Sequence, residues 1–108
     1  MKLTREEALR LHRQMWTDMQ NEIGDEPSAT ERLMFKRKWC MKHFPGEYIS
    51  CSCFLCEYAD DCEHCPIKWD VDYVNANCEG FVVNYLYSPI SVILALPERK
   101  VEDEISDN

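Results

Sequence analysis

The first part of the chain repeats apolar side chains at helical spacing. At about 100° per residue, one face of the stretch from Thr4 to Ile23 is mostly apolar. That face consists of Ala8, Leu11, His12, Met15, Trp16, Met19 and Ile23. Thr4 and Glu7 have the spacing of a capping box, and Gly24 suits a helix end. The pattern therefore predicts an amphipathic helix over residues 4–23.

A second helix is predicted over residues 28–43. Ser28 and Glu31 repeat the capping-box spacing, and Pro45 and Gly46 end the pattern. One stripe of this helix is apolar and consists of Leu33, Met34, Cys40, Met41 and Phe44. Aromatic and basic residues alternate elsewhere on it, and these are Arg32, Phe35, Lys36, Trp39 and Lys42. We expect the helix either to be buried on two sides or to present an aromatic and basic surface.

The second half of the chain predicts shorter elements. Residues 69–74 and 81–87 are rich in β-branched and aromatic side chains, which is typical of two strands in a short β-hairpin. Ser88 and Pro89 suit the cap and the first turn of a short helix that Pro97 would end. Residues 98–108 form a charged, acidic tail.

Two C-x2-C pairs precede the predicted hairpin, and they indicate a metal site. The candidate ligands are Cys53, Cys56, Cys62 and Cys65. Four thiolates suit tetrahedral zinc and close its coordination sphere, so we expect one structural zinc ion rather than the competing iron–sulfur cluster. Only five residues separate the pairs, which is short for a zinc ribbon. Replacement of one ligand therefore stays open, by Cys78 first and otherwise by Cys51 or His64.

Cysteine usage also indicates a compartment. The seven cysteines are odd in number, four of them are paired in C-x2-C turns, and no apolar export signal opens the sequence. These features favour zinc in the reducing cytoplasm over disulfides in a secreted protein. No apolar run reaches the ~20 residues that span a bilayer, so we expect no membrane segment.

Together these elements predict one zinc-stabilised domain over residues 1–108. Its fold class is mainly α, as a small α+β domain. Two N-terminal helices would be followed by a metal-binding knuckle over about 51–78 with a short β-hairpin, and then by a short C-terminal helix.

The formal net charge of −8 is unevenly distributed. Residues 1–50 carry nine basic and eight acidic side chains, whereas residues 51–108 carry three and twelve. Such an acidic half repels nucleic acid and suits a basic protein surface. The sequence contains no Gly-rich phosphate loop, nucleophile elbow or H-E-x-x-H motif, so we expect a protein that is not an enzyme.

The basic and aromatic side of the second predicted helix fits ordinary core packing, and if it is exposed it leaves two functions open. Arg32, Lys36 and Lys42 could contact phosphates while Phe35 or Trp39 stacks on bases, as in a nucleic-acid-binding regulator. The same residue types are common anchors in protein interfaces. Protein binding is the first hypothesis, because the charge of the whole chain is negative.

Several stretches resemble small uncharacterised cysteine-rich proteins of bacteriophages and prophages of Gram-positive bacteria. The resemblance is carried by residues 7–16, 53–59, 62–69, Cys78 and residues 94–99. It implies a phage-derived protein in the host cytoplasm. Small acidic phage proteins often bind and block a host protein. The resemblance therefore implies inhibition of a host factor, such as a defence or nucleic-acid-handling enzyme.

Overall fold

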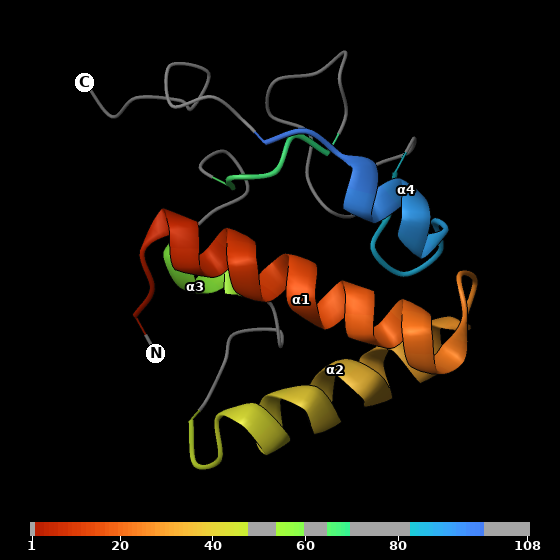
Figure 1. Cartoon of the computed structure of the whole chain (residues 1–108), viewed down its shortest axis with the longest axis horizontal. Helices are drawn as coiled ribbons and strands as arrows, with labels where there is room; N and C mark the ends of the chain where they lie inside the picture. The colour runs from red at the N-terminus through yellow and green to blue at the C-terminus, as the bar shows by residue number, and fades with distance from the viewer. Residues whose placement is uncertain (1, 48–53, 60–64, 70–82, 99–108) are drawn as a thin grey trace.

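The structure is a computed structural model that describes residues 2–47, 54–59, 65–69 and 83–98. These ranges contain the helices α1 (Arg5–Ile23), α2 (Ala29–His43), α3 (Phe54–Tyr58) and α4 (Ile90–Ala95). Figure 1 shows α1 in the middle, with α2 on one side and α4 on the other. A mainly helical fold with two N-terminal helices and a short C-terminal helix is thus confirmed, whereas α3 was not predicted.

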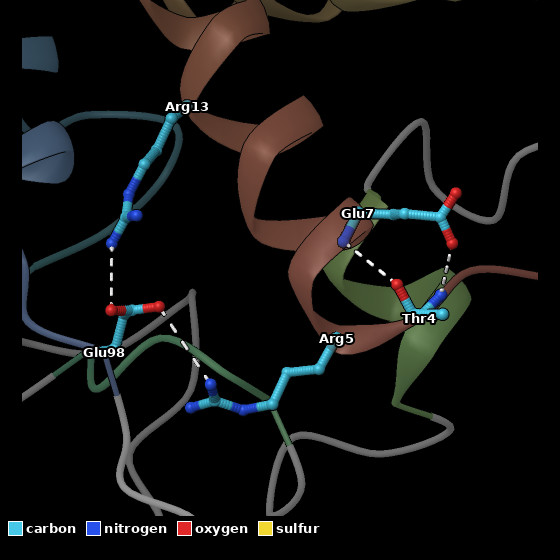
Figure 2. Close-up of polar contacts among 5 residues, drawn as sticks. All are labelled: Thr4, Arg5, Glu7, Arg13 and Glu98. Atoms are coloured by element: carbon cyan, nitrogen blue, oxygen red, sulfur yellow. Dashed lines mark hydrogen bonds and ion pairs between the residues drawn. The ribbon is translucent and has the colours of Figure 1, made fainter.

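Both long helices begin with the predicted capping boxes. The Thr4 hydroxyl accepts a hydrogen bond from the Glu7 amide at 3.2 Å, and the Glu7 carboxylate accepts one from the Thr4 amide at 3.0 Å (Figure 2). Ser28 and Glu31 make the same reciprocal pair at the start of α2. Each box satisfies backbone donors that a helix start leaves without partners, which fixes where the helix begins.

α1 is the centre of the hydrophobic core. It contacts α2, α3 and α4, and all but one of its predicted apolar-face residues are buried, Ile23 being partly exposed. Side chains from distant parts of the chain pack around it, including Phe54, Leu55, Ile67, Ile90 and Ile93. The sequence pattern of α1 therefore predicted its buried face correctly.

Two short extended segments pack beside α1. Ile67 and Glu98 form an isolated antiparallel bridge, and the Lys68 amide donates to the Pro97 carbonyl at 2.9 Å. The Glu98 carboxylate then reaches Arg5 at 4.0 Å and Arg13 at 3.7 Å, both on α1 (Figure 2). These ion pairs are partly exposed, so they orient the segment more than they stabilise it.

The predicted β-hairpin lies mostly outside the described residues, at 70–82. At its described end the prediction is wrong, because residues 85–87 form a turn instead of a strand. The Asn84 side chain accepts from the Leu86 amide at 2.8 Å, and the Asn84 carbonyl accepts from the Ser88 amide at 2.9 Å. Asparagine commonly stabilises a turn through such local bonds.

The start of α4 also differs from its prediction. Neither Ser88 nor any other residue next to α4 caps it through a side chain. Asp25, in the connector between α1 and α2, accepts hydrogen bonds from Ile90 and Ser91 instead. The cap of α4 therefore comes from a residue more than sixty positions away. Within the described ranges, no helix has the length and apolar character that crossing a bilayer requires.

Candidate functional site

The face of α2 that packs on α1 is not the predicted apolar stripe. Its buried residues are Arg32, Lys36, Trp39 and Cys40, which share one helix face by their spacing. Arginine and lysine can fill such a position because their aliphatic stems pack against apolar surface. The core side of α2 is therefore built largely from long cationic side chains and one indole.

Arg32 joins three segments of the chain. Its guanidinium donates to the carbonyl of Pro27 at 3.0 Å, of Tyr85 at 3.1 Å and of Ser88 at 2.6 Å, and the side chain is only 1% exposed. Burial lowers the pKa of Arg32, while the nearby carboxylates of Asp25 and Glu26 oppose that shift. Arginine remains charged in proteins, so these are charge-assisted hydrogen bonds.

Lys36 is buried one turn farther along, where it is 3% exposed. Its ammonium lies over the rings of Trp16 and Tyr85, at 5.8 and 4.8 Å from their centroids. Such cation–π contacts compensate in part for the loss of hydration. Arg32 and Lys36 thus pack in the core of this structure, whereas the sequence also offered them for a partner-binding surface.

The opposite side of α2 is exposed and apolar. Leu33, Met34 and Met41 are 47, 53 and 67% exposed, although the sequence pattern assigned them to the core. Of that predicted stripe, Cys40 is buried and Phe44 packs partly buried against the core. The exposed apolar residues alternate with exposed cations. We call this surface the outer face of α2, and it consists of Leu33, Met34, Arg37, Lys38, Met41 and Lys42.

A hollow of about 490 Å³ adjoins the outer face. α2 lines it with Phe35, Lys38, Trp39, Lys42 and His43, and α1 with Asp18, Asn21 and Glu22. The Trp39 indole donates to the Asp18 carboxylate at 2.8 Å and stacks on the His43 ring at a centroid distance of 4.0 Å. Three of the predicted partner-binding residues, Phe35, Trp39 and Lys42, therefore meet at this hollow.

The predicted zinc ligands lie almost entirely outside the described residues. This applies to Cys53, Cys62, the possible replacements Cys51, His64 and Cys78, and the side chain of Cys56. Phe54 and Leu55, which lie between the two cysteines of the first pair, are fully buried, and Cys65 of the second pair is buried too. Among the described side chains, no three metal-binding groups come together. The zinc site therefore stays a prediction.

His12 is the other ionisable group in the core. Its ring lies edge-on to Trp16 and Trp69, and in the part of the chain that the structure describes its Nε2 atom has no hydrogen-bond partner. Burial, with the nearby Lys36 and Arg13 charges, lowers the pKa of His12 to about 3. It is therefore neutral at pH 7, and its position in the core is as the sequence pattern predicted.

Comparisons of the chain with protein-family models, with curated proteins and with solved structures gave no match. The candidate function therefore rests on the surface of this chain. The outer face of α2 is its clearest feature, because exposed apolar side chains grouped on one helix are a common mark of protein interfaces. Sequence reasoning missed this face, since the same residues fit an apolar core stripe equally well.

Proposed function

We propose that this protein is a binding module that acts by contact with another protein and is not an enzyme. One observation carries the proposal: Leu33, Met34 and Met41 are exposed together on the outer face of α2. Methionine is common at adaptable binding surfaces because its side chain is unbranched and polarisable. Exposing three large apolar side chains on one helix has no benefit for the fold, whereas a partner would cover them.

The partner in this proposal is a host protein. The sequence resemblance favours a phage product in the cytoplasm of a bacterial host, where inhibition of a defence or nucleic-acid-handling enzyme is the expected task. The acidic residues 51–108 add a second attraction, because their net charge of −9 suits a basic groove on such an enzyme.

A single structural zinc ion belongs to the same proposal. The preferred ligands are Cys53, Cys56, Cys62 and Cys65, with Cys78 as the first replacement. A domain of 108 residues has a small core, and the binding energy of a closed zinc site adds directly to its folding energy. Phe54 and Leu55 support this assignment, since the two residues between the cysteines of the first C-x2-C pair belong to the core.

Binding of nucleic acid through α2 is less favoured. Arg32 and Lys36 are buried, and so is Trp39, the largest ring on the helix. Only Arg37, Lys38 and Lys42 remain as exposed cations, and they alternate with apolar side chains. Nucleic-acid surfaces combine exposed cations with exposed rings for stacking. The outer face lacks that combination.

Affinity capture with matched variants tests the proposal. The tagged chain, the double variant Met34→Glu/Met41→Glu and the control Gln14→Glu would each be incubated with lysate of a Gram-positive host. Gln14 is exposed on α1, so the control adds the same charge elsewhere. We expect a discrete protein retained by the wild type and the control and lost from the double variant. Equal retention by all three chains, or no retained protein, would contradict the proposal.

A further inference from the structure

The outer face of α2 has an apolar centre with cations on both sides. Met34 and Met41 are seven residues apart and therefore lie nearly on one line along the helix. By the same spacing rule, Arg37 falls on one side of that line, and Lys38 and Lys42 fall on the other. All five side chains are exposed.

Within the described residues, the cations of this face make no close ion pair, although Asp18 and Glu22 of α1 line the hollow beside Lys38 and Lys42. In the described ranges, no carboxylate lies within ion-pair distance of Arg37, Lys38 or Lys42. Glu31, in the first turn, is the one acidic residue on α2. A chain of net charge −8 thus collects three exposed cations around its exposed methionines. Charge complementarity requires that whatever covers this face be acidic around an apolar centre.

The hollow beside the outer face can receive a side chain of that partner. Lys38 and Lys42 belong to both the outer face and the hollow, while Phe35 and Trp39 provide its apolar lining. A volume of about 490 Å³ is within the range of small binding pockets and is large enough for one aromatic or leucine side chain. Anchors of this kind supply much of the affinity in protein interfaces.

We propose that the outer face of α2 binds an amphipathic α-helix whose apolar stripe is flanked by Asp and Glu and whose anchor side chain enters the hollow. This inference rests on the proposed function and names the chemistry of the partner. A helix is the favoured occupant because helices meet a straight line of exposed apolar side chains, such as Met34 and Met41, with side chains at i, i+3, i+4 and i+7. The apolar stripe of the partner helix would then lie on Met34 and Met41. Its acidic flanks would face the cations of the outer face.

Two synthetic peptides test this inference with the intact protein. Both are about 20 residues long and share one stripe of Leu with a central Trp, but one has Glu and the other Lys on both flanks. Fluorescence anisotropy should show that the Glu peptide binds at least about tenfold more tightly than the Lys peptide. Met34→Glu/Met41→Glu should weaken the Glu peptide by about tenfold or more. Lys42→Glu should shift the preference towards the Lys peptide, and Gln14→Glu should change neither.

Three results would overturn the inference. The first is equal binding of the two peptides, and the second is tighter binding of a single-stranded DNA of similar length through the same residues. The third is self-association of the chain that Met34→Glu/Met41→Glu abolishes, which would make a second copy the occupant. If a host protein is still captured through Met34 and Met41 while the peptide preference is absent, the proposed function stands and only the acidic helix is wrong.

Discussion

Replacing Arg32 with methionine should destabilise the fold strongly, because Arg32 joins three segments of the chain. Methionine keeps most of the aliphatic stem but removes all three charge-assisted hydrogen bonds, to Pro27, Tyr85 and Ser88. Each such bond contributes about 1.5–3 kcal/mol, which gives a gross loss of roughly 5–9 kcal/mol. Relief from burying the guanidinium charge offsets part of this loss, so we expect a net loss of about 3–5 kcal/mol.

This loss is a large fraction of the total stability of a small domain, which is about 5–15 kcal/mol. Urea unfolding followed by tryptophan fluorescence measures it, and the denaturation midpoint should fall while the slope stays the same. Arg37→Met is the matched control, since Arg37 is exposed on the same helix, and it should stay within about 0.5 kcal/mol of the wild type. Arg32→Lys should recover only a minor part of the loss, because a lysine cannot reproduce the guanidinium fork.

An Arg32→Met protein as stable as Arg37→Met would contradict a stabilising role for the Arg32 hydrogen bonds. It would mean that the turn around Ser88 does not depend on α2 for its position. Hydrogen exchange adds a local check, because α4 follows that turn directly. In Arg32→Met the amide of Ile93 should exchange faster, beyond the change in global stability, whereas a uniform change would contradict a local role.

Three further perturbations follow from the caps, the buried histidine and the proposed zinc site. Ser28→Ala should cost about 1 kcal/mol in thermal or urea unfolding, whereas Thr30→Ala within the first turn should cost less, and equal costs would contradict the capping box. His12 stays neutral in the folded protein down to a pKa of about 3 but takes up a proton near pH 6.5 when unfolded, so stability should fall as pH falls from 6.5 towards 3. Between pH 7 and about 4.5 the wild type should lose roughly 2–3 kcal/mol more than His12→Gln, and parallel pH profiles would contradict this. Elemental analysis should find one zinc per chain, and Cys62→Ser should unfold the chain while Cys51→Ser does not; a folded, metal-free protein would exclude the zinc site.

The parts of the fold that the sequence predicted well are those set by local interactions. The start of α1 depends on Thr4 and Glu7, which are three residues apart, and its buried face follows from a clear helical period. The start of α2 was predictable for the same reason. In both cases the residues that determine the structure are neighbours in the sequence.

The parts that the sequence did not predict depend on distant partners. Apolar residues occur all around α2, so periodicity could not identify its buried side. That side was decided by Arg32, whose acceptors at Tyr85 and Ser88 are 53 and 56 positions away. The cap of α4 likewise comes from Asp25. The outer face of α2 results from this choice of buried side, because burying Arg32 and Lys36 turns Met34 and Met41 outward.

Oxidation of methionines by hydrogen peroxide, read by mass spectrometry with and without the captured host protein, shows whether Met34 and Met41 form the binding interface. The chain carries its own control, because Met15 and Met19 are buried whereas Met34 and Met41 are exposed. Alone, the protein should oxidise quickly at Met34 and Met41 and slowly at Met15 and Met19. In the complex, Met34 and Met41 should become protected by about tenfold or more if they form the interface core. Unchanged oxidation of both residues in a saturated complex would show that the protein binds its partner elsewhere.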